Sequence, residues 1–240
     1  MSRKKILILG ATGSIGSALA REINKSYEPV LIARNIDDLE MLSKELNCKY
    51  HICDVLETHN LTNLIESFGD EIFGLAYCVG SINLKPLKLA KEEDFLESYK
   101  INTVGAINSI KAAQTSIIKN NGSILLFSTI AVRQGFINHT VIATAKAAIE
   151  GLTLSLAAEL APKVRVNCIA PSLTDSKMSQ NIIKNINIKK AIETMHPIQK
   201  IGNGEDFAEI SSYLLSENNK WITGQIIHID GGRSTLRIKG

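Results

Sequence analysis

The sequence predicts one α/β domain of 240 residues, built on a doubly wound, seven-stranded parallel sheet with helices on both faces. Two observations predict this class. Seven short apolar runs recur along the chain, and segments with apolar residues at helical spacing separate most of them. The runs are continuously apolar rather than alternating, as in strands buried on both faces of a parallel sheet. We find no linker, repeat or low-complexity tract, so residues 1–240 are expected to form a single domain.

The elements follow in order along the chain. Strands are expected at 5–10, 29–34, 49–55, 72–80, 122–129, 164–171 and 224–232, with helical patterns at 37–46, at 95–119 and within 136–160. The longest interruption is a lysine- and asparagine-rich insertion around 176–204, after the sixth strand. Ligand crevices lie at that end of the strands in open α/β sheets. The insertion is therefore either a mobile substrate lid or two plain surface helices.

Composition excludes several function classes. The net charge of +3 is spread along the chain, which gives no reason to expect nucleic acid or a membrane surface as partner. No apolar stretch approaches the length of a membrane span, and the N-terminal apolar run is too short for a signal peptide. The four cysteines, at 48, 53, 78 and 168, form no CxxC pair. We expect reduced thiols in a cytoplasmic protein, and no metal site.

The first predicted strand runs into GATGSIG, residues 10–16, where a helix begins. Glycines here allow a sharp turn, let the backbone approach a pyrophosphate and aim a helix N-terminus at its charge. A strand, a glycine turn and a helix at the start of a βαβ unit form the dinucleotide-binding signature of the Rossmann fold. The expected cofactor-binding residues of this turn are Gly10, Thr12, Gly13, Ser14, Ile15 and Gly16.

The ends of the second and third strands indicate which dinucleotide is bound. An acidic residue after the second strand would accept bonds from a ribose 2′-hydroxyl, but Arg34, followed by Asn35, suits a 2′-phosphate. The sequence therefore favours NADP over NAD. Asp54, followed by Val55, ends the third strand, and its carboxylate either binds the adenine amino group or caps the next helix.

Along essentially its whole length the sequence resembles the short-chain dehydrogenase/reductase family. GATGSIG resembles the TGxxxGxG turn of that family, with Ser14 at the second glycine, and Asp54-Val55 resembles its adenine-contacting pair. YCVG, residues 77–80, stands where an NNAG motif is expected and keeps Gly80. The resemblance implies a homotetramer or homodimer, because ITGQIIHIDGG, residues 222–232, is similar to the last strand and glycines that support tetramer contacts in the family.

PSLTDSKM, residues 171–178, resembles the PG motif that holds the nicotinamide end of the cofactor. Ser172 replaces the glycine of that motif. The resemblance thereby adds Pro171, Ser172 and Thr174 to the expected cofactor-binding residues.

The chemistry of the family uses a serine, a tyrosine, a lysine and an asparagine. Lys146 matches the lysine of the YxxxK motif, which also binds the nicotinamide ribose, and Asn102 matches the helix asparagine that holds a relay water. Thr129 stands for the serine, since its hydroxyl makes the same hydrogen bonds; strand alternation would point Ser128 to the other face. The tyrosine does not match, because Ile142 occupies its position.

His139 is our candidate for the missing acid. If the helix already runs there, helical spacing puts residues 139, 142, 143 and 146 on one face. An imidazole exchanges protons near neutral pH. Our hypothesis is that His139 donates a proton to a carbonyl oxygen held by Thr129. The alternative is a histidine that lies in the substrate loop or caps the helix and does no chemistry.

These residues predict an NADP-dependent oxidoreductase that transfers hydride between nicotinamide and a small-molecule ketone or secondary alcohol. Apolar residues near the site favour a partly apolar substrate; these are Ile130, Phe136, Met178 and Ile182. The alternative is a catalytically impaired NADP-binding sensor or partner subunit, because general acid–base catalysis contributes about 10²–10⁴-fold and Ile142 supplies none. Isomerase or dehydratase chemistry has no specific residue behind it.

Overall fold

The computed structural model describes residues 3–237 and contains one parallel sheet with the strand order β3-β2-β1-β4-β5-β6-β7. This arrangement confirms the predicted fold class. The strands are β1 (Lys5–Leu9), β2 (Glu28–Ala33), β3 (Tyr50–Ile52), β4 (Ile72–Tyr77), β5 (Ser123–Phe127), β6 (Arg165–Pro171) and β7 (Ile226–Ile229).

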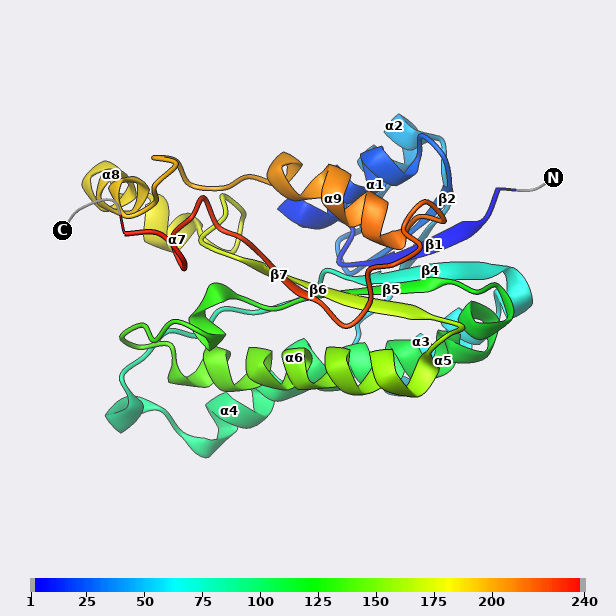
Figure 1. Ribbon diagram of the computed structural model, residues 1–240, viewed down its shortest axis with the longest axis horizontal. Helices are drawn as coiled ribbons and strands as arrows, with labels where there is room; N and C mark the ends of the chain where they lie inside the picture. The colour runs from blue at the N-terminus through cyan, green and yellow to red at the C-terminus, as the bar shows by residue number, and fades with distance from the viewer. Residues whose placement is uncertain (1–2, 238–240) are drawn as a thin grey trace.

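Helices cover both faces of the sheet (Figure 1). On one face lie α1 (Ser14–Ile23), α2 (Ile36–Leu46) and α9 (Glu205–Leu215). On the other lie α3 (Thr58–Glu66), α4 (Glu92–Tyr99), α5 (Gly105–Lys119) and α6 (Thr140–Leu160). The insertion at 176–204 contains two short helices, α7 (Gln180–Ile183) and α8 (Ile186–Thr194).

Strand alternation divides the core into two clusters. Leu7 and Leu9 of β1 pack with residues of α3, α5 and α6, whereas Ile6 and Ile8 pack with residues of α1 and α9. All four side chains are fully buried. A strand buried on both faces has to be apolar at every position, which accounts for the continuous runs in the sequence.

Helix α6 corrects one expectation. We expected no apolar stretch of membrane-spanning length. Helix α6, with 21 residues, is nevertheless long and apolar enough to cross a membrane, judged by length and composition alone. Its residues Ile149, Ala157 and Leu160 belong to the core cluster, and the helix packs along β6. Contact with the sheet therefore explains its apolar character.

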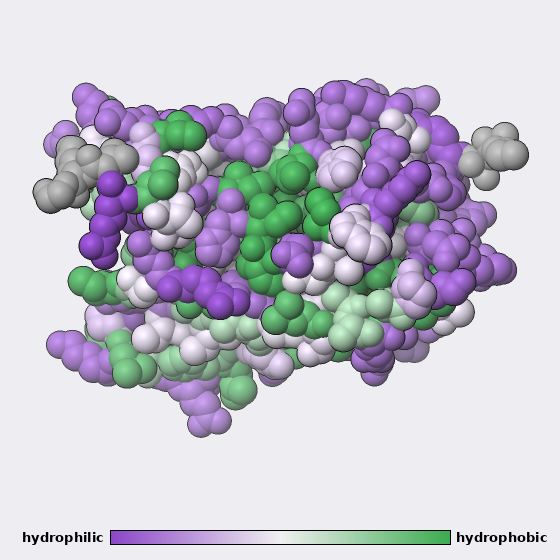
Figure 2. All heavy atoms as spheres, viewed as in Figure 1, coloured by the Kyte–Doolittle hydropathy of each residue, from purple (hydrophilic) through white to green (hydrophobic). Residues whose placement is uncertain are grey.

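Strand β7 forms one edge of the sheet, and each of its four residues is half-buried. Figure 2 shows hydrophobic residues gathered in the middle of the face where β7 runs past α9. Uncovered edge strands and contiguous apolar surface are features that proteins usually cover with another element or another chain.

The pattern at 95–119 predicts one helix, but the structure divides it into α4, a π-helical turn at Lys100–Val104, and α5. The hydroxyl of Tyr77, at the end of β4, donates a hydrogen bond of 2.6 Å to the carbonyl oxygen of Ile101 in this turn. Gly105 leaves room for it, since a Cβ there would lie 2.2 Å from the Tyr77 hydroxyl oxygen. Single π-turns often occur at functional sites, and this one carries Asn102.

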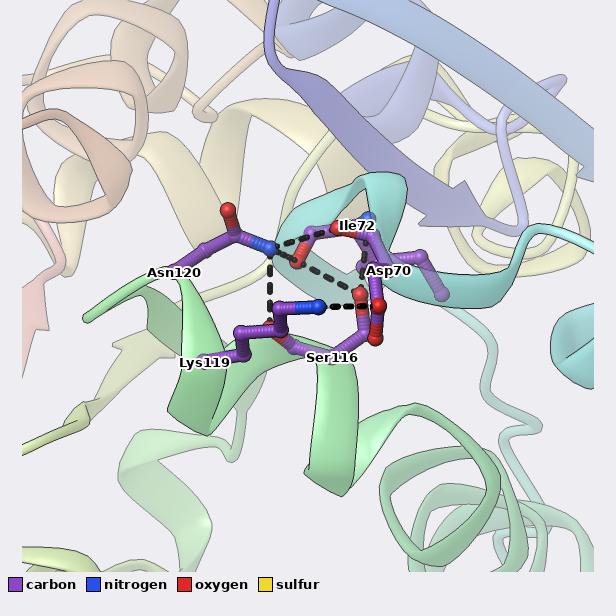
Figure 3. Close-up of polar contacts among 5 residues, drawn as sticks. All are labelled: Asp70, Ile72, Ser116, Lys119 and Asn120. Carbon is purple, nitrogen blue, oxygen red and sulfur yellow. Dashed lines mark hydrogen bonds and ion pairs between the residues drawn. The ribbon is translucent and has the colours of Figure 1, made fainter.

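The opposite end of α5 is held to the start of β4 (Figure 3). The Ser116 hydroxyl accepts a bond of 2.9 Å from the Ile72 amide and donates one of 3.2 Å to its carbonyl oxygen. The Asn120 side-chain amide donates to the carbonyl oxygens of Asp70, Ile72 and Ser116, and Lys119 pairs with Asp70. Helix α5 is thus held to β4 at both ends, which fixes the π-turn relative to the sheet.

Candidate active site

The site lies at the carboxyl ends of the strands, where the strand order reverses between β1 and β4. Two adjoining cavities open there. We name the first, of about 430 Å³, the inner cavity; it is lined by the glycine turn, by the ends of β4, β5 and β6, by the start of α6 and by the insertion. The outer cavity, of about 700 Å³, is lined by the ends of β1, β2, β3 and β4. Both include Gly13 and residues 78–81.

The glycine turn has the backbone geometry that the sequence predicts. Gly10 has φ +78°, and a Cβ there would lie 2.9 Å from backbone atoms of Cys78 and Val79. A Cβ on Gly16 would lie 2.3 Å from the Gly10 carbonyl oxygen. Within residues 3–237, no side chain caps the N-terminus of α1. Its first amides are therefore free to face an anion.

The residues predicted to bind the cofactor all line one cavity or the other. The inner cavity is lined by Ser14, Ile15, Gly16, Lys146, Pro171, Ser172 and Thr174. The outer cavity is lined by Gly10, Thr12, Arg34, Asn35, Asp54 and Val55. Gly13 and Gly80 line both.

At the outer cavity, Arg34 reaches across to Asp54, with 3.4 Å between Nη1 and Oδ2. Asn35 caps α2, because its side chain accepts a bond of 3.0 Å from the Asp38 amide. The proposal that Asp54 caps the next helix is wrong, since the N-cap of α3 is Glu57. Asp54 instead accepts a bond of 2.9 Å from the Leu56 amide within the loop.

Lys146 lies inside the molecule, 8% exposed, in the second turn of α6. Its Nζ donates a hydrogen bond of 2.8 Å to the carbonyl oxygen of Phe127, the last residue of β5. Burial lowers the pKa of the Lys146 ammonium to about 8. The lysine therefore brings a partly desolvated positive charge to the wall of the inner cavity.

Thr129 lines the inner cavity, and its hydroxyl oxygen accepts a bond of 3.3 Å from the Ala131 amide. Within the described part of the chain the hydroxyl proton has no acceptor, so it is available to a ligand. Ser128 lines the inner cavity as well, so the structure does not separate the two residues as strand alternation predicts. The Ser128 hydroxyl is already engaged, because it donates a bond of 3.0 Å to the buried Glu150 carboxylate.

His139 also lines the inner cavity, beside Ile142, which is 5% exposed. The condition that the helix already runs at position 139 is not met, because α6 begins at Thr140 and His139 is its N-cap residue. The imidazole makes no capping bond. Its Nδ1 lies 2.7 Å from the Ile137 carbonyl oxygen. A carbonyl only accepts, so Nδ1 carries a proton and Nε2 remains for exchange.

Asn102 is the one predicted site residue that does not line either cavity. It is fully buried, and its side-chain amide donates a bond of 2.9 Å to the Ser98 carbonyl oxygen and one of 3.1 Å to the Ser81 hydroxyl. A Cβ on Gly80 would lie 3.1 Å from Asn102 Oδ1 and 3.5 Å from Lys146 Nζ. Asn102 therefore lies one layer behind the cavity wall, with Gly80 between it and the cavity.

Three basic residues near the inner cavity were missed from the sequence. Lys177 and Arg233 line it, and Lys177 pairs with Asp38 of α2 at 2.6 Å. His196, which is 1% exposed, lies with Nε2 2.8 Å from the Ser172 hydroxyl, and burial lowers its pKa. The sequence held one signal for Arg233, because this residue directly follows the two glycines at the end of the last predicted strand, close to the expected site.

Comparison with known proteins gives consistent matches. A family model described as enoyl-(acyl carrier protein) reductase matches residues 10–234. The 3-oxoacyl-[acyl-carrier-protein] reductase FabG of Rickettsia bellii is 31% identical over 238 residues, which cover 97% of each chain. Carbonyl reductase family member 4 of Danio rerio is 28% identical over 98% of this chain and 100% of its own. A solved structure of ElxO with NADP bound has a TM-score of 0.89 and 27% identity, covering 98% of this chain and 100% of that one.

Proposed function

Because the chain belongs to the short-chain dehydrogenase/reductase family, we propose that it is an NADP-dependent oxidoreductase acting on a ketone or a secondary alcohol. The observation that carries the proposal is that Lys146 and Thr129 line the same cavity as the glycine turn. A bound substrate there would contact a hydroxyl donor and a cation, next to a site with the geometry for a dinucleotide. The relatives named as reductases support the same reaction class.

The residues present fit a dinucleotide. Gly16 has no space for a Cβ, and the uncapped N-terminus of α1 suits a pyrophosphate. Lys146 would bind the ribose hydroxyls on the nicotinamide side. Arg34, at the other end, would bind a 2′-phosphate, which favours NADP over NAD, and Asp54 would contact the adenine. The NADP-bound structure of ElxO supports this preference.

When bound, NADPH supplies a hydride for the carbonyl carbon. Thr129 would hold the carbonyl oxygen with its free hydroxyl proton. Ile142, at the position of the family tyrosine, has no proton to give. His139 would instead donate a proton from Nε2 to the same oxygen, while the Ile137 carbonyl stabilises the charged ring through Nδ1. In the reverse direction the neutral imidazole would take the proton from the alcohol.

Two further parts have supporting roles in this proposal. Asn102 would hold Gly80 and the loop after β4 in place, and through them the wall beside Lys146. The insertion at 176–204 would act as a substrate lid. In support, Met178 and Ile182 of the insertion line the inner cavity, and Lys177 connects it to α2 through Asp38.

We further propose a cytoplasmic homodimer or homotetramer. The four cysteines are free, as expected of a protein in a reducing compartment. The half-buried edge strand β7 and the exposed side chains of Leu96, Tyr99 and Leu154 offer surface for a second copy. Light scattering of the purified protein would give the mass of the assembly, and a monomer would contradict this part.

The test is NADPH oxidation against a panel of ketones and aldehydes, together with NADPH titration by fluorescence. We expect turnover in the wild type, a fall in kcat of about 10²-fold in His139→Asn, and none in His59→Asn, an exposed histidine on α3. Unchanged kcat in His139→Asn would remove His139 from the mechanism. NADPH binding with no turnover of any carbonyl would favour the alternative, an NADP-binding sensor or partner subunit.

A further inference from the structure

Two cations that the proposed reaction does not use line the inner cavity, Lys177 and Arg233. Arg233 lies after β7, and its guanidinium carbon is 4.8 Å from the centroid of the Phe136 ring. Both residues line the inner cavity together with Lys146 and Thr129. A guanidinium stacked on an aromatic face keeps its edge N–H groups available to an anion.

Charges around Arg233 leave it unpaired. Within residues 3–237, no acidic side chain lines the inner cavity, and Arg233 makes no ion pair. The Asp230 carboxylate, three positions earlier, attracts the guanidinium without forming a salt bridge to it. The side-chain contact of Arg233 is with the Met195 sulfur at 3.5 Å, which is a weak acceptor. Lys177 is already paired with Asp38. Lys146 is bonded to Phe127 on the wall of the cavity.

The backbone that presents Arg233 is fixed. Gly231 and Gly232 have φ values of +62° and +84°, and the Asp230 carboxylate accepts bonds of 2.9 Å from the amides of Gly232 and Ser234. These bonds occupy both carboxylate oxygens of Asp230 and hold the turn. The position of Arg233 is thereby preorganised, which reduces the ordering cost of binding a ligand.

We propose that Arg233 binds a carboxylate on the substrate, so that the carbonyl compounds this protein takes are oxo acids. The proposal rests on the proposed function and names its substrate class. In the proposed function Lys146 binds the cofactor ribose, which leaves the Arg233 guanidinium for an anionic group of the substrate. The planar guanidinium matches a carboxylate through two parallel hydrogen bonds. Ile130 and Phe136 would contact the apolar part of the substrate. Arg233 is therefore a specificity-determining residue and takes no part in proton transfer.

The experiment compares acids with their neutral esters. Benzoylformate and benzoylpropionate, each beside its methyl ester, are assayed with the wild type, Arg233→Gln and Arg233→Lys. In the wild type we expect kcat/KM to be about 10–100-fold higher for the acids. Arg233→Gln should remove this preference by raising KM for the acids, with unchanged ester kinetics and an unchanged Kd for NADPH. Arg233→Lys should keep part of it.

Arg237→Gln is the matched control, because Arg237 is exposed and does not line the inner cavity. Acid preference that survives in Arg233→Gln, or a wild type that prefers the esters, would overturn the proposal. Calorimetric titration of both acids into the NADP⁺-loaded protein tests the carboxylate site separately from the proposed oxidoreductase function. Acid binding that depends on Arg233 without turnover would contradict the proposed function alone, whereas no acid binding to the wild type would overturn the carboxylate site.

Discussion

The ammonium of Lys146 donates a 2.8 Å hydrogen bond to the carbonyl oxygen of Phe127, inside the protein and at the wall of the inner cavity. Burial lowers the pKa of Lys146 from 10.5 to about 8, so its charge is costly to keep in the folded chain. A charge held at such a cost is typical of a residue retained for binding or chemistry rather than for stability.

Lys146 should make stability depend on pH in the alkaline range. Between pH 8 and 10.5 the folded chain loses the Lys146 proton before the unfolded chain does, so its free energy of unfolding rises with pH. Lys146→Met lacks this term. The difference in free energy of unfolding between the two proteins should therefore shift by about 3 kcal/mol across that range, in favour of the wild type. Urea unfolding at pH 7, 8, 9 and 10 measures this difference in free energy. If the free energies of unfolding of the two proteins change with pH in the same way, the lowered pKa of Lys146 is contradicted.

Arg34 should distinguish NADPH from NADH. Its side chain is 75% exposed and contacts only Asp54 at 3.4 Å within the described residues, so a 2′-phosphate can reach it. Loss of a charge-assisted contact in Arg34→Gln should raise the Kd of NADPH by about 10–100-fold and leave that of NADH unchanged. Fluorescence titration measures both. Arg21→Gln, which removes a surface arginine paired with Glu45, is the control. Equal effects on the two cofactors would exclude a 2′-phosphate contact.

Tyr77 should support the site as well as the fold. Tyr77→Phe leaves the Ile101 carbonyl without its 2.6 Å donor and should lower the free energy of unfolding by about 1–3 kcal/mol. Because Ile101 precedes Asn102 in the π-turn, we also expect kcat to fall by about tenfold.

Ser116→Ala is the matched control for Tyr77→Phe, since it removes a buried hydroxyl from the opposite end of the same helix-strand contact (Figure 3). It should cost similar stability and leave kcat unchanged. If both variants change kcat alike, the effect of Tyr77 is a general loss of stability and does not act through the π-turn.

The sheet and the glycine turn could be predicted because their signals are local. Continuous apolar runs follow from burial on both faces. The glycine pattern follows from the sharp turn of the first βα unit, where Gly16 contacts the Gly10 carbonyl and Gly10 contacts the segment directly after β4. The apolar period through 95–119, by contrast, gives no sign of a π-turn. That turn depends on Tyr77, a residue from a different element.

The rest of the inner cavity depends on contacts between distant segments. Arg233 reaches it from the C-terminal turn and stacks on Phe136, 97 positions earlier in the chain. His196 reaches Ser172 through the insertion. Neither contact follows from the periodic spacing of apolar residues. The sequence could therefore indicate single residues of the site, but it could not predict that these pairs are in contact. The helix start, at Thr140 rather than before His139, was likewise beyond the precision of a periodic pattern.

Ile142 gives the sharpest test of the proposed acid. It is one helical turn before Lys146 and lines the inner cavity, so a phenol in its place would face the same space. Ile142→Tyr should raise kcat at least about tenfold, because a tyrosine beside Lys146 supplies a second proton donor. Ile142→Phe, of similar size and without the hydroxyl, should give no gain.

The decisive comparison introduces His139→Asn into the wild type and into Ile142→Tyr. In the wild type this change should lower kcat by about 10²-fold, whereas with Ile142→Tyr present the loss should be much smaller, because the phenol does the same work. Steady-state kinetics of the four proteins with one ketone measure the coupling. If His139→Asn costs the same in both backgrounds, the imidazole and the phenol do not share a role. His139 would then act elsewhere in the inner cavity, and the proton for the carbonyl oxygen would come from another group.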